Sequence, residues 1–263
     1  MNILDSIIAH KKIEVEKQSI MVPVRQLEQR TLFERKCLSL KCSLEKDEST
    51  GIIAEFKRKS PSKGMIHEGA DVEKITGGYV EYGASGLSVL TDSNFFGGSE
   101  RDLLQARINE VPILRKDFII DEYQVIETKA MGADVMLLIA ACLTKQRVKQ
   151  LASFAKRIGL EVLLELHAEV ELEHICDDVD MVGINNRDLK TFKVDIERSI
   201  KMSKQVPAGK LLIAESGISN VDTFAQLRSN GFKGFLIGET FMKEMDPTLA
   251  FKQFVESIQK NKR

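Results

Sequence analysis

Short apolar runs alternate with longer segments of mixed polarity from residue 51 to the end of the chain. Within residues 145–158 the apolar side chains recur at the spacing of one helix face, and Gly159 follows where a C-capping glycine is expected. Near-continuous apolar runs between such helices predict a parallel sheet covered on both faces. The runs that fit strands are Ile52–Phe56, Leu87–Leu90, Pro112–Leu114, Val135–Ile139, Val162–Leu166, Met181–Ile184, Leu211–Ala214 and Gly234–Ile237.

Units of this kind, repeated at a spacing of roughly 25 residues, fit a closed barrel, a fold that typically takes about 250 residues. The alternative is a doubly wound open sheet, which usually has fewer strands and often a G-x-G-x-x-G turn after the first one. No such turn follows the first apolar run. We therefore predict the α/β class and a (β/α)8 TIM barrel, with residues 1–263 forming a single domain.

Residues 1–48 precede the first predicted strand and carry an apolar stripe of their own. Ile3, Leu4, Ile7 and Ile8 form this stripe. The segment is too short to hold an independent core. We expect an N-terminal helical extension packed against one end of the barrel.

Composition narrows the classes of function. The content of 43% hydrophobic and 29% charged residues is that of an ordinary globular protein, and a net charge of −1 offers no basic excess for nucleic acid. No stretch has the apolar length of a membrane span, and no long apolar run precedes Lys11-Lys12 as in a signal peptide. The four cysteines form no C-x-x-C pair and the histidines no metal-binding spacing. We expect reduced thiols, a cytoplasmic location, no metal, no membrane, no obligate protein partner and no fused second enzyme.

The most informative stretch is the end of the first predicted strand. Glu55 and Lys57 share one strand face, because side chains alternate along a strand, and the Ser60-Pro61-Ser62 loop follows. A carboxylate beside an ammonium suits proton-transfer chemistry. The alternative is a surface ion pair next to a basic loop.

Other strand ends carry ionisable groups too. In a barrel the active site lies at the C-terminal ends of the strands, and an ionisable group in an apolar strand is costly unless it is paired or solvated. Glu55, Lys57, Lys116, Glu165 and Glu215 all occupy such ends. They converge only if the barrel closes, and together they predict general acid–base catalysis.

The last two strand ends have the character of a phosphate site. Ser216-Gly217 follows the seventh predicted strand and Gly238-Glu239 the eighth, where phosphate often binds in these barrels. Glycine lets backbone N–H groups approach phosphate oxygens closely. Ser60 can add a hydroxyl, and the Glu239 carboxylate should turn away. These residues predict chemistry on a sugar phosphate without a metal.

The chain resembles the indole-3-glycerol-phosphate synthase family over essentially its whole length. The residues that carry the resemblance are Ile53–Lys63, Leu87–Thr91, Phe96–Ser99, Leu114–Phe118, Gly132–Asp134, Leu163–Glu165, Gly183–Leu189, Ala214–Ile218 and Leu236–Glu239. The resemblance implies ring closure, decarboxylation and dehydration of 1-(2-carboxyphenylamino)-1-deoxyribulose 5-phosphate. The products are indole-3-glycerol phosphate, carbon dioxide and water, and no cofactor is needed.

The resemblance also implies roles for individual residues. Lys116 matches the general acid that protonates the ribulose carbonyl, and Lys57 matches the lysine that pairs with the substrate carboxylate. Glu165 matches the carboxylate of the dehydration step, while Glu55 and Asn185 match residues that orient the lysines. Burial and Lys57 would lower the pKa of Lys116, whereas Glu55 and Glu165 would raise it. The sequence leaves this balance open, and also which of Lys57, Glu55 and Glu165 handles the dehydration proton.

Substrate binding is implied for a further set of residues. Contacts at the seventh strand are expected from Glu215 and Ser216, and phosphate contacts from Ser60, Gly217, Gly238 and Glu239. The apolar anthranilate pocket is expected to be lined by Pro61, Phe96 and Phe118. Glu239 departs from some relatives, which carry Ser there. Arg187 either binds substrate or ties its loop to an acidic partner.

Two other functions remain as alternatives. One is a different phosphate-barrel enzyme, such as phosphoribosylanthranilate isomerase, which uses a Cys–Asp or paired-carboxylate arrangement. No cysteine stands at the end of the first predicted strand, which counts against it. The other is a non-catalytic barrel that binds a phosphometabolite, against which the intact set of ionisable residues argues.

Overall fold

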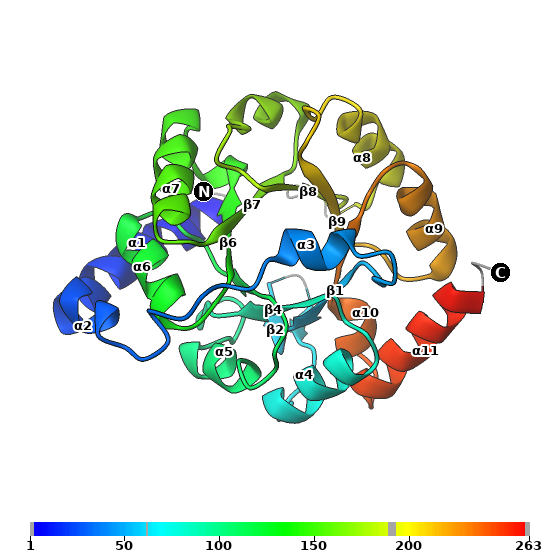
Figure 1. Ribbon diagram of the computed structural model, residues 1–263, viewed down its shortest axis with the longest axis horizontal. Coiled ribbons are helices and arrows are strands. Elements are labelled where there is room, and N and C mark those ends of the chain that lie inside the picture. Colours follow the sequence, from blue (N-terminus) through cyan, green and yellow to red (C-terminus); the bar gives the residue numbers. More distant parts are fainter. Residues whose placement is uncertain (1–2, 62, 189–192, 261–263) are drawn as a thin grey trace.

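A closed barrel of parallel strands forms the centre of the computed structural model, which describes residues 3–61, 63–188 and 193–260 (Figure 1). The strands follow one another around the barrel in the order β1-β10-β9-β8-β7-β6-β5-β4. Their bounds are β1 Ile52–Phe56, β4 Gly86–Leu90, β5 Ile113–Lys116, β6 Val135–Ile139, β7 Glu161–Leu166, β8 Met181–Asn185, β9 Leu211–Glu215 and β10 Gly234–Ile237. Every apolar run predicted as a strand forms one, which confirms the (β/α)8 barrel. Ser62 and Leu189, each part of a motif, lie outside the described residues.

Helices that follow the strands in the chain surround the barrel (Figure 1). Their bounds are α4 Val72–Glu81, α5 Glu100–Ala106, α6 Glu122–Ala130, η1 Ala140–Cys142, α7 Lys145–Arg157, α8 Ile196–Ser203, α9 Val221–Ser229, α10 Glu239–Met242 and α11 Pro247–Lys260. Side chains that accept hydrogen bonds from the first helical turn fix many of the starts, at Asp71, Ser99, Asp121, Thr144, Asp195 and Asn220.

Two local features depart from a regular alternation. A two-stranded ribbon, β2 Lys59–Ser60 with β3 Gly64–Met65, follows β1. Between β7 and β8 the chain forms a 3-10 helix, η2 Glu169–His174, in place of the α-helix that a regular repeat would have. This connection is short, and short connections are where 3-10 geometry is used.

Side chains on each strand alternate between two apolar layers. Ile52 and Ala54 belong to the layer between strands and helices, whereas Ile53 belongs to the layer inside the barrel. Leu114, Leu163 and Ile213 also point inward. Because side chains alternate along a strand, each residue two positions further on points inward as well. The fold therefore aims the polar strand ends at the barrel axis.

The N-terminal segment contacts both ends of the barrel, whereas contact with one end was expected from the sequence. It contains α1 Ile3–Met21, α2 Val24–Glu28 and α3 Leu40–Glu45. Leu40 and Leu44 of α3 join the inner layer at the starts of the strands, and Figure 1 shows α3 in front of the strand ring. Helix α1 reaches the opposite end, where Leu4 and Ile7 line the main cavity. The apolar stripe of α1 and the apolar residues of α3 thus bury against different ends.

In the part of the chain that the structure describes, no helix combines the length and the apolar character needed to cross a membrane.

Candidate active site

A cavity of about 900 Å³ opens at the C-terminal ends of the strands. Its volume is in the range of small-molecule sites, which are clefts of about 300–1,000 Å³. The residues singled out from the sequence all line it: Glu55, Lys57, Ser60, Pro61, Phe96, Lys116, Phe118, Glu165, Asn185, Arg187, Glu215, Ser216, Gly217, Gly238 and Glu239. Barrel closure brings these residues together from strand ends that are far apart in sequence.

Lys116, at the end of β5, lies between carboxylates from β7 and β9. Its Nζ donates a hydrogen bond to Glu165 Oε2 at 3.2 Å and lies 3.6 Å from Glu215 Oε2. The longer of the two distances is beyond the range of a hydrogen bond. Gly183 of β8 makes room for Glu215, because a Cβ at this glycine would overlap Glu215 Oε1. The ammonium group is therefore held from two sides inside the barrel.

The electrostatic balance around Lys116 favours its charged form. Burial alone lowers the pKa of an amine, but the charge of Glu165, with those of Glu55 and of Glu215 when it is ionised, raises the pKa of Lys116 above its ordinary value. The sequence left open whether the pKa of Lys116 is lowered or raised, and in the structure it is raised. Glu215, when ionised, contributes to this increase in addition to Glu55 and Glu165. A cation at this place can stabilise negative charge that develops on a substrate oxygen.

The two carboxylates beside Lys116 have pKa values pushed in opposite directions. For Glu165, burial is outweighed by Lys116 and His167, which lower its pKa below the ordinary range. For Glu215, burial and the negative charge of Glu165 raise the pKa to about 8. Near neutral pH, Glu165 is thus ionised and Glu215 is largely protonated. Carboxyl groups separated in this way can divide base and acid roles between them.

Glu55 and Lys57 form a direct pair on one face of the β1 end, as their spacing predicts. Lys57 Nζ lies 2.6 Å from Glu55 Oε1, and the Glu55 side chain is almost fully buried. Gly238 gives Glu55 its space, because a Cβ at this glycine would stand 2.6 Å from Glu55 Oε1. The alternative of a surface ion pair is therefore wrong, because the pair lies in the cavity wall.

Glu165 has two further neighbours. Asn185 Nδ2 donates a hydrogen bond to Glu165 Oε1 at 2.8 Å. His167 Nε2 lies 3.0 Å from the same oxygen, and its side chain is buried. His167 was not singled out from the sequence. Its position two residues beyond Glu165, on the same strand face, was the signal that could have found it.

The loops after β9 and β10 form one wall of the cavity. Ser216 has a φ of 65°, a left-handed conformation that is uncommon for a non-glycine residue, and such residues often cluster at functional sites. Gly217 follows with a φ of 69°. Across the cavity mouth, Glu239 Oε2 lies 3.4 Å from Arg187 Nη2, and Glu239 Oε1 lies 3.8 Å from Lys63 Nζ. Arg187 therefore both lines the cavity and contacts an acidic partner.

Two aromatic rings line the cavity together with the charged groups and form an aromatic wall. The rings of Phe96 and Phe118 have centroids 5.9 Å apart and both line the cavity. Pro61 and the α1 residues Leu4 and Ile7 extend this apolar surface. The α1 residues were not expected at the site. Their apolar stripe was visible in the sequence, but nothing in it indicated which end of the barrel they would cover.

Comparison with known proteins agrees with this geometry. The family model described as indole-3-glycerol phosphate synthase matches residues 4–254. Proteins named indole-3-glycerol phosphate synthase from Bacteroides thetaiotaomicron and Campylobacter fetus are 48% and 43% identical to the chain. The first alignment covers 98% of this chain and 99% of the relative, and the second covers 92% and 95%.

Solved structures share the fold at low sequence identity. Tryptophan synthase subunit alpha from Legionella pneumophila matches with a TM-score of 0.61 at 14% identity, covering 84% of this chain and 97% of that one. The 3-hexulose-6-phosphate synthase from Salmonella typhimurium matches with a TM-score of 0.62 at 12% identity, covering 80% and 99%. These likenesses establish the barrel alone. The extent of the family match and the identity to relatives along their full length establish that this chain belongs to the indole-3-glycerol phosphate synthase family.

Proposed function

We propose that the cavity at the C-terminal end of the barrel performs indole-3-glycerol phosphate synthesis with Lys116 as its leading acid. Membership of the family makes the chain a carboxy-lyase of tryptophan biosynthesis and does not favour the isomerase or the non-catalytic alternative. The observation that carries the assignment is the position of the Lys116 ammonium, 3.2 Å from Glu165 and 3.6 Å from Glu215 in the cavity.

Ring closure is the step that Lys116 serves in this proposal. The aromatic carbon of the substrate attacks the ribulose carbonyl, whose oxygen gains negative charge as the carbon–carbon bond forms. The Lys116 ammonium stabilises that charge and transfers a proton to the oxygen, which becomes a hydroxyl. Lys57 exchanges its contact with Glu55 for a contact with the substrate carboxylate. This carboxylate then leaves as carbon dioxide, and its loss restores the aromatic ring.

Loss of water completes the indole, and Glu165 is the carboxylate best placed to take part. It is ionised beside Lys116 and is oriented by the hydrogen bond from Asn185. The Glu165 carboxylate accepts the proton lost from the carbon beside the ring nitrogen. The Lys57 ammonium, released when carbon dioxide leaves, donates a proton to the hydroxyl, which departs as water. None of these steps calls for a cofactor.

The remaining cavity walls fit the two ends of this substrate. We assign the apolar surface of Pro61, Phe96 and Phe118 to the anthranilate ring, since aromatic side chains bury a flat apolar group well. We assign the phosphate to the backbone and hydroxyl groups of Ser60, Ser216, Gly217, Gly238 and Glu239. The nearby cations Lys63 and Arg187 support this second assignment.

We also propose a cytoplasmic location. All four cysteines are unbridged in the structure, and free thiols persist in reducing compartments.

The test of the assignment is Lys116→Met. We expect the variant to fold and its turnover to fall by about 10²–10⁴-fold, the usual contribution of a positioned acid. Product formation is followed by the fluorescence of the indole ring, and folding by circular dichroism. The matched control is Lys149→Met on the exposed surface of α7, which should keep wild-type turnover. Turnover near that of wild type in Lys116→Met would overturn the role of this lysine.

A further inference from the structure

Helix α1 carries a fully buried lysine outside the site described above. The Lys11 side chain has 0% exposure, and its Nζ lies 3.0 Å from carboxylate oxygens of Glu14, Asp92 and Asp117. A buried charge is costly unless it is paired. Burial would lower the pKa of Lys11, but the three carboxylates raise it above its ordinary value, so Lys11 is a cation. Asp92 and Asp117 belong to two different loops at the rim of the active-site cavity.

Asp92 binds the backbone of the loop that carries Phe96. Its Oδ1 accepts hydrogen bonds from the backbone N–H groups of Phe95 and Phe96 at 2.8 and 3.2 Å. Its Oδ2 is buried and has no hydrogen-bond partner among the described residues, but it lies 3.0 Å from Lys11 Nζ. Lys11 is therefore the group that compensates the second oxygen of a carboxylate holding one half of the aromatic wall.

Asp117 binds the backbone of Phe118, the second residue of the aromatic wall. It stands between Lys116 and Phe118, and its Oδ1 accepts the Phe118 N–H at 2.8 Å while it pairs with Lys11. Its Oδ2 accepts from Thr91 Oγ1 at 2.6 Å and from Arg115 Nη2 at 3.0 Å. Both oxygens are thus engaged, and the one that accepts the Phe118 N–H is the one that pairs with Lys11.

We propose that Lys11 is a positioning residue for substrate binding, which holds the Phe96–Phe118 wall in place by bridging Asp92 and Asp117. This inference rests on the proposed function, in which that wall receives the anthranilate ring. Lys116 has its own support from Glu165 and Glu215 and does not need Lys11 to stay in place. The effect of Lys11 therefore falls on binding rather than on the chemical step.

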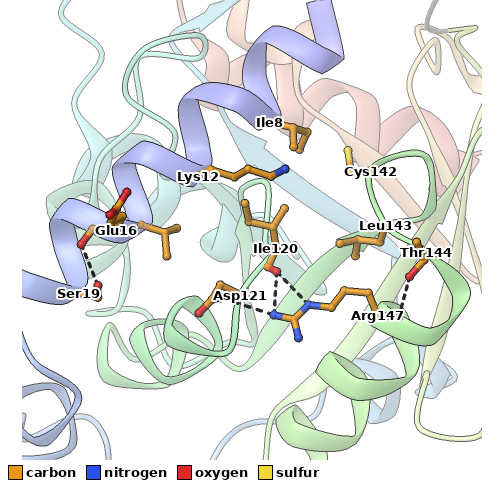
Figure 2. A pocket seen from close by; sticks show the side chains of 11 residues that line it. Ile8, Lys12, Glu16, Ser19, Ile120, Asp121, Cys142, Leu143, Thr144 and Arg147 are labelled. Atoms are coloured by element: carbon orange, nitrogen blue, oxygen red, sulfur yellow. Dashed lines mark hydrogen bonds and ion pairs between the residues drawn. The ribbon is translucent and has the colours of Figure 1, made fainter.

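Helix α1 has few buried side chains and borders a second cavity on its other side. Among the described residues of α1, only Ile7 and Lys11 are buried. Beside the helix lies a second cavity of about 600 Å³, between α1 and the loops that precede α6 and α7. Figure 2 shows Lys12 extending into this cavity, with Arg147 and Leu143 on its far side. Helix α1 is also attached to α6, because the Tyr123 hydroxyl donates a hydrogen bond to the Gln18 carbonyl oxygen at 3.1 Å. The Lys11 cluster differs from this contact in that it joins a fully buried charge on α1 to the two loops that carry the aromatic rings.

Two variants test the proposal, and Lys12→Met is the matched control. Lys11→Met removes the buried cation while keeping an unbranched side chain, and we expect KM to rise about tenfold or more with kcat within about threefold of wild type. Asp92→Asn keeps the acceptor for the backbone N–H groups and weakens only the contact with Lys11. It should raise KM in the same direction by a smaller factor. Lys12→Met removes the same charge from the exposed neighbour and should leave both constants unchanged.

The outcomes separate this inference from the assignment of the site. A wild-type enzyme that forms no indole-3-glycerol phosphate would refute the proposed function, whatever Lys11 does. If wild type is active, unchanged KM in folded Asp92→Asn and Lys11→Met would refute the positioning role. The same holds if Lys12→Met raises KM equally, or if Lys11→Met loses kcat at constant KM. Should Lys11→Met not fold, the KM of Asp92→Asn decides between the two outcomes. Circular dichroism at the assay temperature establishes that each variant is folded.

Discussion

Replacing Glu215 by glutamine should make the stability of the barrel depend differently on pH. The carboxyl group of Glu215 is buried, and burial with the charge of Glu165 displaces its pKa from 4.5 to about 8. The folded protein therefore holds a proton that the unfolded chain releases between these two values. Stability from this group is fully present below the unfolded pKa and is lost as the pH rises through the folded pKa.

The magnitude follows from the size of the displacement. Each unit of pKa corresponds to about 1.4 kcal/mol, so the full displacement sets an upper limit of about 5 kcal/mol on the stability lost at alkaline pH. Structural relaxation and water entry around a buried carboxylate reduce this figure, and we expect about 2–4 kcal/mol. Glutamine has the shape of the protonated acid, so the space that Gly183 leaves accommodates it.

Urea unfolding of wild type and Glu215→Gln at a series of pH values measures the effect. The free energy of unfolding of the variant relative to wild type should grow as the pH rises from about 5 to about 8, and then level off. Glu256→Gln, on the exposed surface of α11, is the control and should show no such trend. Parallel curves for wild type and Glu215→Gln would refute the assignment of a raised pKa to this group.

Three further substitutions probe other parts of the structure. Gly183→Ala places a Cβ against Glu215 and displaces it from Lys116, so kcat should fall by about 10–100-fold in the indole fluorescence assay, and wild-type kcat would contradict this. Asn185→Ala removes the hydrogen bond that orients Glu165, and kcat should fall about tenfold while KM stays near that of wild type. Leu40→Ala empties a fully buried position at the other end of the barrel and should lower the free energy of unfolding by about 2–5 kcal/mol with kcat unchanged; a loss of kcat in the folded variant would show that the two ends are coupled.

The strands and the identity of the site residues were readable from the sequence because both obey a local rule. Each strand is a short apolar run, and a polar residue two positions beyond an inward-facing apolar one also faces inward. Glu55 follows Ile53 in this way, and Lys116 follows Leu114. Side-chain alternation, together with the rule that barrel active sites lie at C-terminal strand ends, was enough to identify the ionisable candidates Glu55, Lys57, Lys116, Glu165 and Glu215. The other candidates, such as Asn185, Phe96 and Phe118, came from the resemblance to the family.

The arrangement of charges within the site could not be read in the same way. Whether Lys116 is flanked by one carboxylate or several depends on distances across the barrel. The alternation of side chains along a strand does not determine these distances. The sequence points to Glu55 and Glu165 around this lysine and places Glu215 among the substrate contacts. In the folded chain Glu215 lies 3.6 Å from the lysine, and its pKa is raised by burial that no local pattern reveals.

The N-terminal segment shows the same division most clearly. Its amphipathic pattern determined that it would form helices and bury an apolar stripe. Lys11 and Lys12 are equivalent in the sequence, where they serve only to interrupt an apolar run. In the structure one is fully buried among carboxylates from two distant loops, and the other is exposed at a cavity. The sequence by itself determined the elements and the chemical groups they carry, since these follow from local periodicity. Which groups meet, and with what protonation, was decided only by the tertiary structure, because burial and charge pairing arise between segments far apart in the chain.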